Sequence, residues 1–144
     1  MIYILDSNAM AYLRANRLNI PDDARCFVPK EIEEEFLGDA RNDAWYSECT
    51  FIEPDIDLGM YLTDYADILN RYRHISFYSL KGLGDVSILT NASALLKGGR
   101  RNGQLFIEPV CIVTGDGGLR EFAVAEFTGN FSVLSPSDFA AQQN

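Results

Sequence analysis

Short apolar runs alternate along this chain with longer segments of helical periodicity, and this alternation limits the possible folds most strongly. We expect five strands, at residues 2–5, 26–28, 50–52, 110–113 and 131–134. Apolar residues three or four positions apart predict five helices, at residues 8–18, 29–37, 57–72, 85–97 and 119–126. Strands that alternate with helices form a parallel sheet with helices on both faces. The sequence therefore predicts one α/β domain over residues 1–144, with three α/β/α layers and a central parallel sheet of about five strands.

Two of the expected helices carry further local signals. Ser7 precedes the first helix, where serine is favoured as an N-cap because its side chain accepts a hydrogen bond from the first turn. The segment 57–72 is predicted to be a long helix from the spacing of Leu58, Leu62, Tyr65 and Leu69.

The chain is strongly acidic. Its 21 Asp and Glu residues against 12 Lys and Arg residues give a formal charge of −9. Such a charge repels nucleic acid and anionic membranes over long range, so net charge alone argues against both as partners. The longest stretch without a charged residue is eleven residues, which is too short to cross a bilayer. No secretion signal is recognised at the N-terminus, so we expect a cytoplasmic protein without a membrane partner.

The three cysteines, Cys26, Cys49 and Cys111, form no close pair in the sequence. An odd number of cysteines in a chain without an export signal argues against a disulfide framework, and their spacing does not suggest a zinc site. We expect three buried, reduced thiols.

Two aspartates follow apolar strands closely. Asp6 ends the run 2–5, and Asp116 lies three residues after the run 110–113. In an open parallel sheet, the loops after the carboxyl ends of the strands build the site. A carboxylate beside a buried strand needs a hydrogen bond, a cation or another partner, because burying an unpaired charge is costly. Either aspartate could instead be a helix N-cap, a position that favours this residue.

Two further acidic positions lie on expected helices. Asp85 stands at the start of an apolar stripe that must face the core, so its carboxylate points inward, although it too could be an N-cap favoured by the helix dipole. In the run 31–35, Glu33 and Glu35 flank the apolar stripe of their helix about equally, so helical geometry does not decide which of them turns inward. Such charge runs are usually a solvated helix face.

A group of converging carboxylates suggests a metal site. Without cations, carboxylates a few ångströms apart raise one another's pKa and repel. Mg2+ and Mn2+ prefer carboxylate, carbonyl and water oxygens, so they turn the same group into a binding site. One or two such ions lower the pKa of a bound water, hold a phosphate oxygen and stabilise a leaving oxyanion. The acids therefore indicate phosphodiester hydrolysis with Mg2+ or Mn2+ as cofactor.

The acidic positions and their neighbours resemble the motifs of the PIN-domain nucleases. Four blocks occur in the order of that family: Asp6-Ser7-Asn8 after the first strand, Val28-Pro-x-x-Ile32-x-x-Glu35-Phe36, Gly84-Asp85-x-x-Ile88, and Thr114-x-Asp116. They span residues 3 to about 125, and the ordered set on an alternating strand and helix frame is more specific than any single block. The resemblance also selects Glu35 from the glutamate run.

The resemblance implies a metal-dependent endoribonuclease with a PIN-like fold, in which one or two Mg2+ or Mn2+ ions are bound by Asp6, Glu35, Asp85 and Asp116. In this family a metal-activated water attacks the phosphodiester in line and leaves a 5′-phosphate and a 3′-hydroxyl. Asn8 and Thr114 match polar positions that orient the metal ligands. Compact single-domain members of this size look most like the VapC toxins of toxin–antitoxin pairs. For this chain, that resemblance implies an RNA substrate, a homodimer and an antitoxin protein as partners.

Two features depart from the pattern of the family. Gly118 stands where many relatives carry a further acid, which bears on whether a second metal is held. The acidic balance is unusual for a ribonuclease, and Lys97, Arg100 and Arg101, expected between the fourth helix and the fourth strand, could be a local phosphate contact or only a solubilising loop.

These departures leave open a PIN-like RNA- or protein-binding module with weak or no catalysis. A third alternative is a haloacid-dehalogenase-like phosphatase, since those enzymes also carry an aspartate after the first strand. They place a second aspartate two residues later, where this chain has Asn8.

Overall fold

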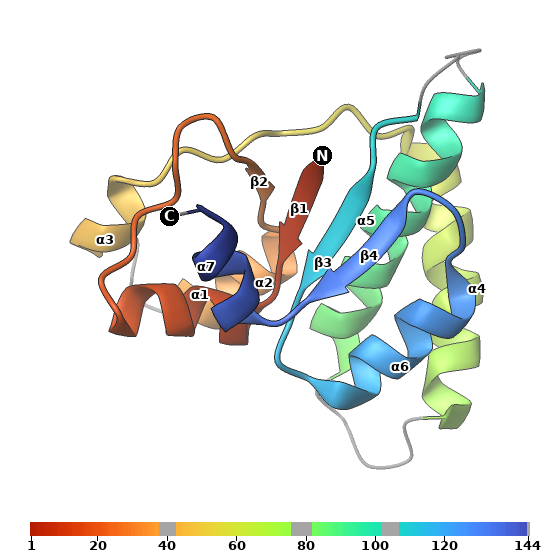
Figure 1. Ribbon diagram of the computed structural model, residues 1–144. Helices are drawn as coiled ribbons and strands as arrows, with labels where there is room; N and C mark the ends of the chain where they lie inside the picture. The colour runs from red at the N-terminus through yellow and green to blue at the C-terminus, as the bar shows by residue number, and fades with distance from the viewer. Residues whose placement is uncertain (38–42, 76–81, 102–106, 144) are drawn as a thin grey trace.

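The computed structural model describes residues 1–37, 43–75, 82–101 and 107–143, in which helices surround one parallel sheet (Figure 1). The elements are, in chain order, β1 (Ile2–Leu5), α1 (Ser7–Ala15), β2 (Arg25–Phe27), α2 (Lys30–Leu37), α3 (Ala44–Ser47), α4 (Leu58–Ile75), α5 (Gly82–Arg101), β3 (Val110–Val113), α6 (Gly117–Glu126), β4 (Phe131–Leu134) and α7 (Pro136–Gln143). The predicted α/β class is confirmed.

The strands of the sheet lie in the order β2-β1-β3-β4, and all neighbouring pairs are parallel. The strand order reverses between β1 and β3, which is where ligands bind in open α/β sheets. The register pairs Leu5 with Val113, so the residues that follow them, Asp6 and Thr114, lie at the same level. The carboxyl ends of β1 and β3 and the beginnings of α1, α5 and α6 all lie towards the lower edge in Figure 1.

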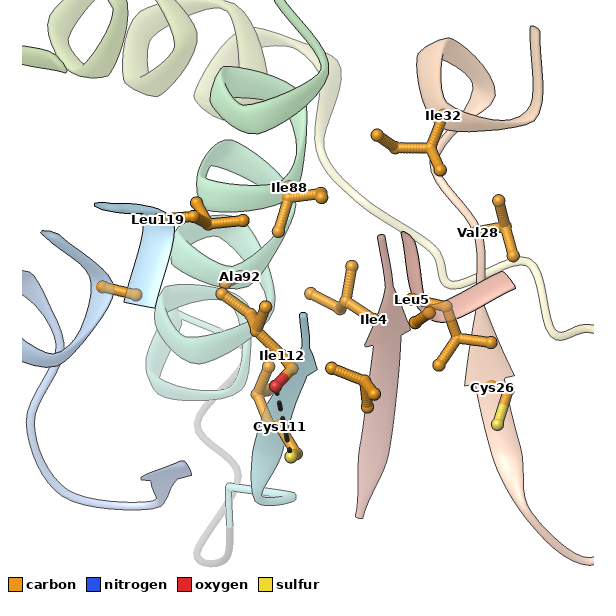
Figure 2. Packing of buried hydrophobic residues seen from close by; sticks show 14 of the residues in the cluster. Ile4, Leu5, Cys26, Val28, Ile32, Ile88, Ala92, Cys111, Ile112 and Leu119 are labelled. Carbon is orange, nitrogen blue, oxygen red and sulfur yellow. Dashed lines mark hydrogen bonds between the residues drawn. The ribbon is translucent and has the colours of Figure 1, made fainter. Parts of the chain in front are cut away.

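The core lies between the sheet and its helices. Helix α5 contacts β1 and β3, and Figure 2 shows Ile4 and Ile112 of these strands beside Ile88 of α5. All three side chains are fully buried, and burial of such apolar surface contributes about 25 cal/mol per Å2. Tyr3, whose side chain points to the other face of β1, meets Phe139 of α7 edge-on with 5.0 Å between ring centroids. Helices on both faces are compatible with the predicted three-layer architecture.

The prediction of about five strands is wrong for the described residues, in which the sheet has four. Residues 50–52 form no strand, although the Ile52 N–H donates to the Cys26 carbonyl at 2.8 Å. In a strand, every second residue directs its N–H to the same neighbouring strand. Two residues after Ile52 stands Pro54, which has no N–H to donate to β2. Pairing therefore ends after one bond, and the segment stays irregular beside the edge strand.

Helix α7 is not predicted by the apolar spacing, yet the sequence contains its start signal. Ser135 precedes Pro136, and its hydroxyl accepts a hydrogen bond from the Asp138 N–H at 3.1 Å. A serine cap followed by proline at the first helical position is typical of a helix start. The one-turn helix α3 is likewise not predicted; its N-cap is Asp43.

The buried face of helix α4 overlaps only in part with the stripe that indicated it, since Tyr65 and Leu69 pack against the core. Leu58 and Leu62 are 69% and 57% exposed, whereas Asp64, Ile68 and Tyr72 are buried. Asp64 can be buried because its carboxylate accepts a hydrogen bond from Ser93 Oγ at 3.0 Å and pairs with Lys97 Nζ at 2.9 Å, both on α5. The packing of α4 on α5 is therefore partly polar, which apolar spacing alone does not reveal.

Helix α5 is 20 residues long and extends beyond both predicted ends. Its buried surface includes Ser87, Thr90 and Asn91. Among the residues that the structure describes, no helix is both long and apolar enough to cross a membrane.

The cysteines are free thiols, as predicted. Cys26 and Cys111 are buried, and burial raises the pKa of Cys26 to about 12. Cys49 is only half-buried, so the expectation of three buried thiols is corrected in that respect. A thiol with a raised pKa is protonated and unreactive at neutral pH, which agrees with a structural role.

Candidate metal centre

The four predicted acids come from separate parts of the fold. Three lie at the start of a helix at the carboxyl edge of the sheet: Asp6 before α1, Asp85 in the first turn of α5 and Asp116 before α6. Glu35 lies in the second half of α2. The negative charges of Asp6, Asp116 and Glu35 all act on the Asp85 carboxyl. The structure therefore brings the four acids into one electrostatic environment.

Asp6 is held from two sides. Its Oδ1 accepts the Ser7 N–H at 2.7 Å, which makes Asp6, and not Ser7 as predicted, the N-cap of α1. Its Oδ2 accepts hydrogen bonds from Thr114 Oγ1 at 2.7 Å and Asn8 Nδ2 at 3.0 Å. Burial raises the pKa of Asp6 above its ordinary value and the charge of Asp116 adds to the rise, although the hydrogen bonds from Thr114 and Ser7 oppose it.

Asn8 and Thr114 connect the two strand ends. Asn8 Oδ1 accepts the Gly115 N–H at 2.8 Å, and Thr114 Oγ1 accepts the Asp116 N–H at 3.0 Å. Each of these side chains thus binds Asp6 on one side and the loop that carries Asp116 on the other. The two polar residues fix the position of one acid relative to the other.

Asp116 is the N-cap of α6. Its Oδ1 accepts the N–H groups of Gly118 at 2.8 Å and Leu119 at 3.1 Å, while its side chain remains exposed. The N-cap alternative therefore describes both Asp6 and Asp116 correctly. It does not conflict with metal binding, because a carboxylate has about four acceptor sites and the Asp116 hydrogen bonds use only one of its oxygens.

Asp85 lies inside α5, which begins at Gly82, so it is not an N-cap. Its side chain is buried with Ile88 and Leu89 of the same stripe, and its Oδ2 accepts a hydrogen bond from the hydroxyl of Tyr72 at 2.7 Å. Burial, and then repulsion from the three other acids, raise the pKa of Asp85 to about 6, against the opposing effect of the Tyr72 bond. An ionised Asp85 is thus held in an environment that disfavours its charge.

Tyr72 is a site residue that sequence reasoning missed. It lies on α4, 13 positions before Asp85, and reaches it only because α4 packs on α5. No motif or spacing in the sequence marks this tyrosine among the seven in the chain.

Glu35 lies against the start of α5. Its Oε2 is 2.8 Å from the place that a Cβ on Gly84 would occupy, while the side chain stays exposed to solvent. The other candidate, Glu33, hydrogen-bonds Tyr46. Of the two glutamates left open by helical geometry, Glu35 is thus the one whose charge acts on Asp85.

The donor set fits a hard divalent cation in chemistry. All four groups are carboxylates, and in the described part of the chain none of them pairs with Lys or Arg. Across the described ranges, no three His, Cys, Asp or Glu side chains converge into a ready metal-ligand group. Asp6 and Asp85 are buried and anchored, so closer convergence would come from the exposed side chains of Glu35 and Asp116.

The predicted basic contact lies away from these acids. Helix α5 continues to Arg101, so Lys97 stands on a helix and not in a loop as expected. It is 12 residues beyond Asp85, or about 18 Å at 1.5 Å per residue, and its ammonium pairs with Asp64. The side chains of Arg100 and Arg101 lie outside the described residues.

Comparisons of the chain with protein families, with characterised proteins and with solved structures return no match. The candidate site is therefore defined by its own geometry. Four carboxylates from separate segments lie at the carboxyl edge of the sheet, where the charges of the other three act on Asp85, and the two buried ones have raised pKa values. Such a group can accept a divalent cation or protons, either of which reduces the repulsion.

Proposed function

We propose that this protein is a Mg2+- or Mn2+-dependent endoribonuclease of the PIN-domain type. The observation that carries the proposal is the state of Asp85, a buried carboxyl whose pKa is raised to about 6 by burial and by three neighbouring acids. Unneutralised acids at a single edge of a sheet are a poor structural device, and a bound divalent cation removes the repulsion. The ordered motifs that contain these acids resemble those of the PIN-domain nucleases, and this resemblance indicates hydrolysis of RNA phosphodiester bonds.

The chain's residues divide the work of the site. When bound, one or two metal ions supply an activated water and stabilise the leaving oxygen of the phosphodiester. Asp6 and Asp85 are the rigid ligands, because each is buried and hydrogen-bonded. Asp116 is fixed through its cap, and Glu35 stands at the exposed rim. RNA approaches from the side where these last two side chains meet solvent.

The proposal includes partners. A toxin of a toxin–antitoxin pair would act on cytoplasmic RNA, form a homodimer and bind an antitoxin protein. The exposed side chains of Leu58 and Leu62 on α4 offer an apolar surface for such a protein partner. With a net charge of −9, RNA contacts should be local and sensitive to salt.

The test is RNA cleavage by the purified full-length chain. Single-stranded and structured RNAs are incubated with Mg2+, with Mn2+ or with EDTA, and the product ends are mapped. We expect cleavage that EDTA abolishes and that leaves 5′-phosphate ends. Asp6→Asn should lower the rate at least about 100-fold, whereas the matched control Asp138→Asn, in the first turn of α7, should not. Cleavage that survives EDTA or Asp6→Asn would rule out this mechanism.

A second candidate is an RNA- or protein-binding module with weak or no catalysis. Two observations favour it: Gly118 replaces an acid of the family pattern, and within the described residues no three potential ligands already converge. This candidate predicts RNA or protein binding without metal-dependent turnover. Calorimetric titration of the metal-free protein with Mn2+ helps to separate the two, because an absence of binding favours the module.

A further inference from the structure

We infer that Tyr72 is a positioning residue of the metal centre, which holds the Asp85 carboxylate in one orientation for the cation. The inference rests on the proposed function, since it concerns the same site. Tyr72 Oη donates a hydrogen bond to Asp85 Oδ2 at 2.7 Å. Only 5% of Tyr72 and 9% of Asp85 is exposed, so water has little access to compete for this bond.

The tyrosine ring is itself held in place by packing. It meets Phe122 of α6 edge-on, with 5.2 Å between ring centroids and an angle of 89° between the ring planes. Phe122 is also buried. Helix α6 is the helix that Asp116 caps, so Tyr72 contacts both the Asp85 side chain and the helix that follows Asp116. The position of its hydroxyl is therefore set by the same elements that carry the acids.

This bond gives Asp85 a role that its burial alone does not. A carboxylate can rotate about its terminal side-chain bond, and a fixed donor on one oxygen limits that rotation. Metal ligands are commonly oriented by an outer hydrogen-bond partner, and loss of that partner typically lowers metal affinity 10- to 100-fold. Removing the Tyr72 hydroxyl should therefore weaken metal binding while the ring and its packing remain.

Tyr61 provides a matched control on the same helix. Its hydroxyl lies 3.4 Å from Ser87 Oγ of α5, so Tyr61→Phe removes the same atom from the same α4–α5 interface. Ser87 in turn donates to Glu31, which is not one of the four acids. An effect of losing any tyrosine hydroxyl from this interface would appear in both variants, whereas an effect on Asp85 would appear only in Tyr72→Phe.

The experiment measures Mn2+ binding to the metal-depleted full-length chain by calorimetry, together with thermal unfolding in EDTA. We expect Tyr72→Phe to weaken Mn2+ binding about tenfold, Tyr61→Phe to change it less than about twofold, and Asp85→Asn to abolish it. Saturating Mn2+ should largely restore the cleavage rate of Tyr72→Phe, because the variant loses affinity and not a reacting group.

Normal Mn2+ affinity in a folded Tyr72→Phe protein, with binding lost in Asp85→Asn, would overturn the inference and leave the proposed function standing. Normal affinity in Asp85→Asn, or no Mn2+ binding by the unmodified protein, would instead contradict the proposed metal site. Should Tyr72→Phe fail to fold, Phe122→Leu tests the same bond by removing the ring that holds Tyr72. Unchanged Mn2+ affinity in that variant would count equally against the inference.

Discussion

The carboxylate of Glu35 lies in the space that a side chain on Gly84 would need. A Cβ atom on Gly84 would be 2.8 Å from Glu35 Oε2 and 2.9 Å from Ile32 Cδ1, closer than side chains approach one another. The absence of a side chain at Gly84 thus allows α2 and α5 to come together at this point. That approach brings the charge of Glu35 to Asp85, the next residue.

We expect Gly84→Ala to displace Glu35 and Ile32. Overpacking costs about 1–3 kcal/mol, here mainly through the buried Ile32 because the exposed Glu35 side chain can shift, and the helix propensity of alanine offsets about 1 kcal/mol of it. We therefore expect a net loss of up to about 2 kcal/mol in unfolding free energy, and the displaced carboxylate should also weaken Mn2+ binding. The control is Gly98→Ala, also in α5, where an added Cβ would meet no atom within 4 Å. Alanine is the better helix former by about 1 kcal/mol, so this variant should be as stable as the unmodified protein or more so. Equal stability changes in the two variants, measured by urea unfolding, would contradict the close contact.

Ionisation of Asp85 should oppose folding in the absence of metal. Its pKa rises from 3.8 to about 6 in the folded protein, so between these values the folded state binds the proton more tightly than the unfolded state. The contribution of Asp85 to stability therefore falls as pH rises from about 4 to about 6 and is level above that. Since one pKa unit corresponds to about 1.4 kcal/mol, Asp85→Asn should stabilise the metal-free protein at pH 7 by on the order of 1–3 kcal/mol.

Urea unfolding in EDTA across this pH range, with Asp138→Asn as the control for a lost surface charge, measures the effect of Asp85. The Asp85→Asn variant should show a flatter dependence of stability on pH than the unmodified protein. A variant that is less stable than the unmodified protein at pH 7 would contradict the raised pKa.

Thr114→Val should remove the side-chain link between Asp6 and the backbone of Asp116. The hydroxyl donates to Asp6 and accepts the Asp116 N–H, so valine leaves a buried carboxylate with one donor fewer and a backbone N–H without this partner. We expect a loss of about 1–3 kcal/mol in unfolding free energy and weaker Mn2+ binding.

Thr90→Val is the matched control for Thr114→Val. Thr90 is also buried, but among the described residues its hydroxyl bonds only the Val86 carbonyl of its own helix, at 2.7 Å. This variant should lose less stability and keep its Mn2+ affinity. Unchanged Mn2+ binding in Thr114→Val as well would show that the hydroxyl does not orient the site.

Lys97→Ala should affect stability more than RNA binding. The ammonium pairs with the largely buried carboxylate of Asp64, and it stands about 18 Å along α5 from Asp85. We expect a stability loss of about 1 kcal/mol and unchanged affinity for RNA, measured by fluorescence anisotropy at two salt concentrations. A clear loss of RNA affinity that high salt removes would instead support the phosphate contact expected from the sequence.

Local patterns predicted the parts of the fold that depend on neighbouring residues. The apolar runs at 2–5 and 110–113 are strands whose side chains are nearly all buried, as a short continuous apolar run predicts. The run 50–52 has the same appearance, yet whether it pairs depends on the next donor along the chain, and Pro54 has none. The buried face of α4 depends on Asp64 meeting Ser93 and Lys97, a contact between two helices that apolar spacing does not record.

The sequence by itself determined that Asp6 and Asp116 follow buried strands, because strand formation and the position after a strand are local properties. The tertiary structure alone decided that these strands are neighbours in register, which places Asp6 beside Thr114. It also decided that Glu35 reaches Gly84 and that Tyr72 reaches Asp85. These contacts depend on how α2 and α4 pack on α5, and packing between distant segments is set by the shapes and partners of whole helices rather than by any run of residues.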